Sequence, residues 1–453
     1  MSTPRARAVF GAIVAGAILL TIGTVWAGET TLTLSEAVHT ALERHPALQA
    51  AGYQVQAASS AVDQARAGFL PRVDFSEGVT RGDNPVYAFG SLLNQGRFTQ
   101  ADFAVDRLNH PDPISNWRTN LSGSVPILTG GRTILGFQQA KIGVDAARSS
   151  RERAEQETIF GVVRAYSAFL LAEEAKATFD ASVRTAEANL ATAETRVEAG
   201  LAVASDALSA RVRLARLQEE SIAAANHIRL ARAALNEAVG FPLDSARPVS
   251  GRLSLPEVRQ ERLDGLDALA LTARPDYRQA QLEEQRLEKE VLRTKGAVLP
   301  TVELQGNYEI NNNRFASNGQ DNWTVGVMLN WNLFSGGRDW ARISEARANH
   351  QRAIALRERL ANQIGLEVRD AFLALQTARE RVAVARTAVS QAEESLRIVQ
   401  DRYDSGLTTI VELLDAEAAH SASRTTLTRN LYEATVTQAR LDLSLGALTR
   451  ERF

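Results

Sequence analysis

The residue types that most often carry chemistry are scattered along this chain without the spacing that chemistry needs. The 453-residue sequence has no cysteine, which excludes thiol nucleophiles, thiolate metal sites and disulfides. No serine lies in a Gly-x-Ser-x-Gly turn. The histidines lack metal-ligand spacing, and we expect structural or solvated roles for all six: His39, His45, His110, His227, His350 and His420. The sequence therefore predicts no catalytic residue, no metal site and no cofactor.

Glycine pairs and net charge exclude two further functions. Gly130-Gly131 and Gly336-Gly337 are not part of a Gly-x-x-x-x-Gly-Lys-Ser/Thr phosphate loop, so we expect both pairs to be turns between a strand and a helix. The chain has 51 basic and 53 acidic residues. A balance this even gives no sign of a nucleic-acid partner.

Two acidic residues stand out by their position. Glu412 and Asp415 lie three residues apart just after a predicted helix start, so they share one face of that helix. From the residues alone, their simplest role is to complement the positive end of the helix dipole. Gly200 and Gly406 lie where long helical patterns end, which is the usual place for a helix-ending glycine.

The N-terminus has the layout of a secretory signal peptide. Arg5 and Arg7 precede an apolar stretch over 9–26, and Val25-Trp26-Ala27 fits a cleavage site after Ala27. The alternative is an uncleaved inner-membrane anchor, because the stretch approaches the length that spans a membrane. Small residues at the site and the polar residues that follow favour cleavage. No later segment is apolar enough to cross a membrane as a helix.

The chain contains an internal repeat. Landmarks recur at an offset of 206 residues, and upstream landmarks at an offset of 229, so the first copy carries a 23-residue insertion between Pro71 and Asn116. The landmarks are Gly130-Gly131-Arg132 with Gly336-Gly337-Arg338, Asn116-Trp117 with Asn322-Trp323, Arg196 with Arg402, Gly200-Leu201 with Gly406-Leu407, Gly240 with Gly446, Pro46 with Pro275, and Leu70-Pro71 with Leu299-Pro300. We therefore expect two structural repeats, 28–248 and 264–453, joined by a linker over 249–263.

Each repeat predicts the same order of elements. A front helix ends at a Leu-Pro pair, two strands with alternating apolar residues follow, and a very long helix and a shorter return helix complete the unit. The predicted helices are 35–68, 132–199 and 203–239 in the first repeat and 264–297, 338–405 and 409–445 in the second. The predicted strands are 72–80 and 117–127, then 301–310 and 322–333.

The long helices predict a rod that packs sideways on other helices. At 1.5 Å per residue, 68 residues extend roughly 100 Å. Apolar residues alternate spacings of four and three along both helices, which is typical of coiled-coil packing. The seam positions are Ala186, Leu190, Ala193 and Val197, and Ala378, Val382, Ala385, Val389, Ala392, Leu396, Val399 and Tyr403. One front and one return helix together match one long helix in length, so we expect them to run alongside it end to end.

The strands predict a membrane-spanning part. Four strands cannot close a barrel, and an open sheet edge cannot lie in lipid, so closure needs several copies of the chain. Three copies would give twelve strands, within the range of outer-membrane barrels. The expected fold is thus mainly α, with a transmembrane β-barrel above a helical tunnel. The insertion, within 82–113, should lie at the cell surface, either folded over the mouth by its aromatic residues or as a disordered loop.

Over essentially the whole mature chain, the sequence resembles the TolC-type outer-membrane efflux proteins. The front-helix segment 41–48 and the Leu70-Pro71 end carry part of the resemblance, and the hairpin segment 402–417 is its most specific part. The resemblance implies a homotrimeric, non-enzymatic channel in the outer membrane that extends into the periplasm. It implies a duct for an efflux pump or a type I secretion system, working with a periplasmic adaptor and an inner-membrane transporter.

The resemblance also implies roles for particular residues. Glu412 and Asp415 would form an acidic ring at the periplasmic entrance, and Asp206 and Tyr403 would help hold the entrance closed. Adaptor docking would involve the helix tips Gly200, Leu201, Gly406 and Leu407. One departure is that Thr408 stands where some members carry an arginine, which argues against a latch built on that side chain.

Two other functional classes fit the sequence less well. A periplasmic adaptor also carries a long helical hairpin, but it has one hairpin flanked by β-rich domains and not a duplicated helix-strand-strand-helix unit. A structural coiled-coil spacer would not need the strands. The residues do not reveal which substrate is transported or which transporter is served.

Overall fold

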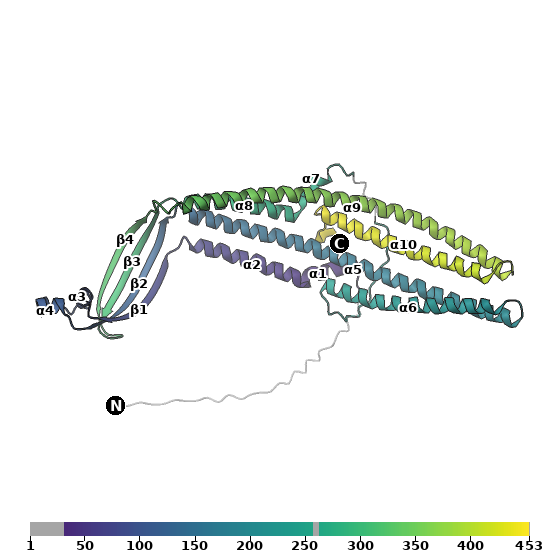
Figure 1. Cartoon of the computed structure of the whole chain (residues 1–453), viewed down its shortest axis with the longest axis horizontal. Helices are drawn as coiled ribbons and strands as arrows, with labels where there is room; N and C mark the ends of the chain where they lie inside the picture. Colours follow the sequence, from purple (N-terminus) through teal and green to yellow (C-terminus); the bar gives the residue numbers. More distant parts are fainter. Residues whose placement is uncertain (1–30, 257–261, 453) are drawn as a thin grey trace, which may run out of the picture.

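The computed structural model describes residues 31–256 and 262–452. The molecule is a long rod of helices with a small sheet at one end (Figure 1). The predicted signal peptide, 1–27, and part of the predicted linker lie outside the described residues. The two helix turns at Gly200 and Gly406 lie together at the end of the rod opposite the sheet (Figure 1).

The sheet has four antiparallel strands in the order β1-β2-β3-β4. Their bounds are Arg72–Gly82, Ile114–Leu128, Thr301–Asn312 and Gln320–Asn330. Cross-strand partners place apolar residues in one row, Phe75, Leu121, Tyr308 and Trp323, and polar residues in the adjacent row, Asp74, Ser122, Asn307 and Thr324. Because successive side chains point to opposite faces, the sheet has one apolar and one polar face.

The last strand is shorter than the sequence pattern predicts. The alternation continues to Leu333, but β4 ends at Asn330, which pairs with Thr301, the first residue of β3. Pro300 precedes Thr301 and has no N–H to donate, so the ladder loses its partner there. Trp331 instead donates its indole N–H to the carbonyl oxygen of Val298 over 3.1 Å.

The insertion in the first repeat folds into short helices. They are α3 (Pro85–Asn94), the 3₁₀ helix η1 (Gln100–Phe103) and α4 (Val105–Asn109). Phe98 stacks edge-on against Phe89 and Phe103, with ring centroids 4.8 and 5.0 Å apart. This segment projects beyond the sheet at the far end from the helix rod (Figure 1). The insertion is therefore ordered and not a disordered loop; a position over the mouth of the barrel stays a prediction.

The front helix of each repeat is two helices, not the single helix predicted from the sequence. The first repeat has α1 (Leu34–Arg44) and α2 (Pro46–Ala67), and the second has α7 (Leu266–Ala273) and α8 (Pro275–Gly296). The break falls at the residue before each proline, which has extended backbone with ψ near 126°. Proline disfavours the helical conformation in the preceding residue, so each helix ends and restarts there.

The long helices have close to the expected bounds. They are α5 (Arg132–Glu198) and α9 (Arg338–Asp404), each with 67 residues, and they return through α6 (Ala204–Val239) and α10 (Ile410–Ser444). A final 3₁₀ turn, η2, spans Arg450–Arg452. Every predicted seam position on α9 is buried or half-buried. Helices α2 and α6 pack along α5, and α8 and α10 along α9, so each short pair runs beside one long helix.

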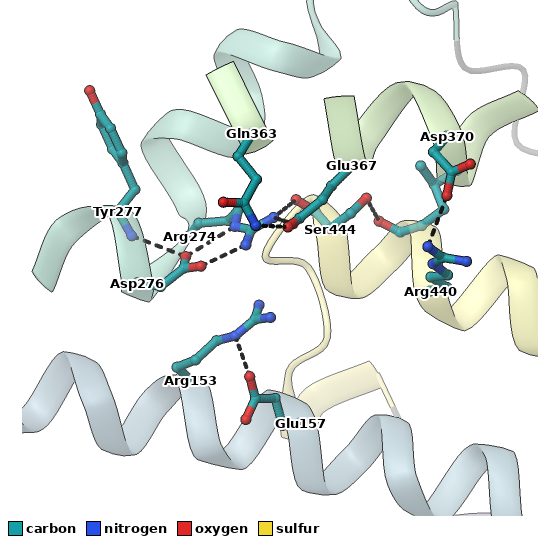
Figure 2. A network of polar contacts seen from close by, with 11 residues as sticks. Arg153, Glu157, Arg274, Asp276, Tyr277, Gln363, Glu367, Asp370, Arg440 and Ser444 are labelled. Carbon is teal, nitrogen blue, oxygen red and sulfur yellow. Dashed lines mark hydrogen bonds and ion pairs between the residues drawn. The ribbon is translucent and has the colours of Figure 1, made fainter. Parts of the chain in front are cut away.

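A buried arginine joins the helices of the second repeat at about the middle of the rod (Figure 2). Arg274, the residue of the α7–α8 break, is 2% exposed. Its guanidinium binds both carboxylate oxygens of Asp276, at 3.0 and 2.6 Å, and Glu367 of α9 at 2.7 Å. It also donates to the carbonyl oxygen of Ser444, the last residue of α10, over 3.3 Å. The buried guanidinium is therefore paired and hydrogen-bonded, and it joins α8, α9 and α10 without leaving an unpaired buried cation.

The described part of the predicted linker packs against the rod. Leu32 and Val249 form a parallel bridge, and Leu253 packs on the core around Phe169, which joins α1, α5 and α6. The Tyr166 hydroxyl of α5 donates to the carbonyl oxygens of Leu32 and Ser250. This segment therefore lies across the helices and packs against them.

Candidate functional site at the helix tips

Both tips are built by the same glycine-ended turn. Gly200 and Gly406 have φ of 75° and 72°, in the left-handed region that glycine adopts without strain. The N–H of each glycine donates to the carbonyl oxygen of the residue three positions earlier, over 3.0 Å. The N–H of the following leucine donates to the carbonyl oxygen five positions earlier, over 2.8 Å. This pair of bonds is the Schellman motif, and it satisfies carbonyl groups at the end of α5 and α9. The following residues, Leu201 and Leu407, are 79% and 70% exposed.

The two acidic residues lie in the first turns of α10 and are exposed. Thr409 caps this helix, because its hydroxyl accepts from the N–H of Glu412. The hydroxyl of Thr408 donates to the carboxylate of Glu412. Asp415 lies one turn later, and both carboxylates are open to solvent. Thr408 therefore acts within its own tip and holds the Glu412 side chain.

Tyr403, one of the two predicted gate residues, is buried between the two hairpins, which are formed by α5 with α6 and by α9 with α10. It is 5% exposed and belongs to an apolar cluster with Ala193, Ala210, Ile410 and Leu413, so that all four tip helices contribute. Burial raises the pKa of its hydroxyl, and the nearby Asp206 carboxylate adds to this effect while Arg196 opposes it. Asp206 is half-buried in the first turn of α6. The sequence-predicted pair is thus close together in space.

Arg196 is a tip residue whose contacts the sequence reading did not identify. Its guanidinium lies 4.2 Å from the centre of the Tyr403 ring. It also donates to the backbone oxygens of Tyr403 and Asp404, over 2.9 and 3.4 Å, and lies 3.8 Å from the Asp404 carboxylate. A cation at the carbonyl end of a helix is favourable, so Arg196 of α5 caps α9. The repeat at offset 206 singled out Arg196, but periodicity alone does not say which helix it caps.

A second polar site between the hairpins begins at Glu417, two residues after Asp415 on α10. Glu417 of α10 accepts a hydrogen bond from the Asn189 amide of α5 over 2.5 Å. Burial raises the pKa of this carboxyl group, and Asn189 and Arg213 partly offset the rise. Glu417, Arg213 and His420 line a cavity of about 170 Å³ between the two hairpins. In the sequence Glu417 is notable only as the last residue of the hairpin segment 402–417, and no local signal predicts that it is half-buried.

Two features are absent from residues 31–256 and 262–452. None of the helices there combines the length and the apolarity needed to cross a membrane. None of the His, Asp and Glu side chains in that part of the chain gather in threes with a geometry suited to a metal ion.

Comparison with known proteins places the chain in a family. The model of the family described as "Outer membrane efflux protein" matches residues 37–241 and 267–447, which fall one in each repeat. The proteases secretion protein PrtF of Dickeya chrysanthemi is 23% identical over 96% of this chain and 93% of its own length. The outer membrane efflux protein BepC of Brucella suis is 23% identical over 97% of this chain and 91% of its own length.

Solved structures show the same fold. The CmeC outer membrane channel of Campylobacter jejuni matches with a TM-score of 0.79 and 17% identity, over 91% of this chain and 85% of that one. The outer membrane protein VceC of Vibrio cholerae matches with a TM-score of 0.77 and 21% identity, over 91% of this chain and 96% of that one. Given the family match over both repeats, the chain belongs to the outer membrane efflux protein family.

Proposed function

We propose that the protein is the outer-membrane exit duct of a tripartite efflux pump or a type I secretion system. The observation that carries this function is the four-stranded sheet with one apolar face and two free edges, β1 and β4, at the end of a long helix rod. An apolar sheet face with unpaired edges is stable in lipid only if the edges are closed. The family of transport channels to which the chain belongs supports the same conclusion.

Closure by three copies gives the proposed assembly. Pairing β4 of one chain with β1 of the next would make a twelve-stranded barrel with the row of Phe75, Tyr308 and Trp323 toward lipid. The polar row with Asp74 and Asn307 would then face the lumen. The helices of three chains would continue the lumen as a tunnel into the periplasm. Relatives named for efflux and for protease secretion leave both cargo classes open.

The tips would form the periplasmic entrance. Glu412 and Asp415 would line it as an acidic ring, and Tyr403 with Asp206 would help hold the hairpins in the closed arrangement. Gly200 and Gly406 would hold Leu201 and Leu407 at the outermost positions, where they would contact a periplasmic adaptor bound to an inner-membrane transporter. Exposed leucines on a rigid turn suit such an apolar contact.

One experiment on the mature protein tests assembly and docking together. A photo-crosslinking amino acid replaces Leu201 or Leu407 in cells that also express an adaptor of the same system, and the purified protein is weighed by native mass spectrometry. We expect a trimer that is crosslinked to the adaptor from both positions. The matched control is the same amino acid at Leu269, which is 51% exposed but lies far from the tips in α7. A monomer, or equal crosslinking from the control position, would contradict the proposal.

A further inference from the structure

Repeat-related positions in the halves of the hairpins that lead to the tips have opposite exposures. Thr178 of α5 is 8% exposed, whereas its counterpart on α9, Val384, is 70% exposed. Leu414 of α10 packs on the tip cluster, whereas its counterpart on α6, Leu208, is 58% exposed. Within the described part of one chain α10 packs on α5, whereas Val384 on the same face of α9 and Leu208 on the same side of α6 are exposed. The exposed face of α9 in one chain therefore matches the exposed side of α6 in another chain.

The intrachain contact shows how these two surfaces fit. Arg196, in the last turn of α5, caps the carbonyl end of α9 through the oxygens of Tyr403 and Asp404. Its repeat counterpart, Arg402 in the last turn of α9, is exposed, and no ion pair or side-chain hydrogen bond joins it to any residue within 31–256 or 262–452. Glu198 at the end of α5 is the counterpart of Asp404. It is likewise exposed and unpaired among these residues.

We infer that Arg402 latches each subunit to the next at the entrance, by capping α5 of the partner subunit at the oxygen of Val197 and the carboxylate of Glu198. This inference rests on the proposed trimer. When three chains stand around one axis, the first repeat of the partner subunit follows the second repeat of this chain, as the second follows the first within the chain. The contact of Arg196 with α9 is then repeated by Arg402 with the partner subunit's α5.

Charge and packing both suit this occupant. Arg402 is a cation facing the carbonyl end of a helix and the acidic Glu198, so attraction and helix dipole act in the same direction. The bare apolar residues complete the seam, because Val384 of α9 and Leu208 of the partner subunit's α6 take the places of Thr178 and Leu414. The entrance would thus be held by six arginine contacts of two kinds, three within chains and three between them.

Paired cysteines test the intersubunit contact. The chain has no cysteine of its own, so introduced thiols report without background. Glu198→Cys and Arg402→Cys are combined in one chain, and the purified trimer is treated with a short bismaleimide. We expect covalent dimers and trimers on a denaturing gel. The matched control combines Arg196→Cys with Asp404→Cys, the intrachain pair, and should stay at monomer mass.

The possible outcomes separate this inference from the proposed function. A protein that is trimeric by native mass spectrometry but gives only monomers from the 198/402 pair overturns the latch and leaves the trimer standing. A monomeric preparation overturns both. Each single-cysteine variant, treated in the same way, must stay at monomer mass. Crosslinking from a single variant would mean that the thiols meet a different surface, which also contradicts the latch.

A charge swap gives a functional readout that does not depend on crosslinking. Arg402→Glu places two acids opposite each other, and we expect the entrance to open more often in planar bilayers, with open probability rising severalfold, as for a partly exposed ion pair. Combining it with Glu198→Arg should restore the wild-type open probability. An Arg402 that only complements its own helix end would show no such rescue, and absence of rescue would contradict the latch.

Discussion

Glu417 has an environment unlike that of a surface acid. Its carboxylate is half-buried between α5 and α10, and burial raises its pKa. The folded state then holds a proton on Glu417 more readily than the unfolded state does, so ionisation of this group destabilises the fold at neutral pH. This loss of stability is present at a pH above the raised pKa and is relieved as the pH falls through that pKa. The ionisable groups that line the same cavity are Glu174 of α5, Arg213 of α6, and His420 and Arg424 of α10 itself.

We therefore predict that Glu417→Gln raises the unfolding temperature at pH 7.5. Glutamine keeps an oxygen for the Asn189 amide and removes the charge. The gain over wild type should shrink as pH falls toward the ordinary glutamate pKa of about 4.3. Thermal unfolding of the two proteins across this range checks the prediction. Glu187→Gln, at an exposed position on α5, is the control and should change little. A gain that is independent of pH would contradict a burial cause.

Some residues of the tips can be located from the sequence alone, whereas the contacts of others cannot. The positions of Gly200, Gly406, Glu412 and Asp415 follow from local patterns, because helix-ending glycines and helix-start acids have signals within a few residues. Their proposed roles in docking and in the entrance are still predictions. The contacts of Arg196 and Glu417 join helices that are more than 200 residues apart in the chain. Nothing local determines such pairings.

At the scale of elements, the ends of the return helices differ between the repeats. Gly240 and Gly446 are repeat counterparts, both with positive φ, of 84° and 70°. A Cβ on Gly446 would lie 2.9 Å from the backbone carbon of Ala273, closer than real contacts allow. A Cβ on Gly240 would lie 3.5 Å from its nearest neighbour, an ordinary contact with Arg44. The α7–α8 break is thus held tightly against the end of α10.

We predict that Gly446→Ala is more destabilising than Gly240→Ala. Both substitutions carry the left-handed strain of about 1–2 kcal/mol. Only Gly446→Ala must also displace the backbone beside Arg274, and with it the network of Figure 2. Thermal or denaturant unfolding of the two variants compares them directly. Equal losses of stability in the two variants would contradict this prediction, because the α7–α8 break would then accommodate the added methyl group without a further loss of stability.

The helix breaks and the insertion mark the limit of prediction at this scale. Period and length predicted the long helices, because a heptad seam sustained over many turns has few alternatives. Each front helix was predicted as one helix, but it breaks at the residue before Pro46 or Pro275, because proline disfavours helical backbone in the preceding residue. The helices of the insertion depend on contacts among Phe89, Phe98 and Phe103, which sequence order does not define.

At the scale of the whole molecule, the tip at Gly406 is the end of a path that begins at the sheet. Helix α9 runs unbroken from the end of the sheet to this tip, and α10 returns from it to the Arg274 site (Figure 1). In the proposed trimer, Glu412 and Asp415 of three chains bring six carboxylates around one aperture. Rings of like charge at a constriction focus the electrostatic potential and select ions of the opposite charge.

We therefore predict that the closed duct prefers cations and is blocked by multivalent cations, and that replacing Glu412 and Asp415 together by alanine weakens both properties. Trimer stability should change little, because both carboxylates are exposed and the Thr409 cap remains. Single-channel recording in planar bilayers, wild type against the double variant at several salt concentrations, measures selectivity and block. Glu187→Ala removes an exposed acid away from the tip and serves as the control. If the double variant keeps the selectivity and block of the wild type, these acids only complement the α10 dipole, and the constriction lies elsewhere.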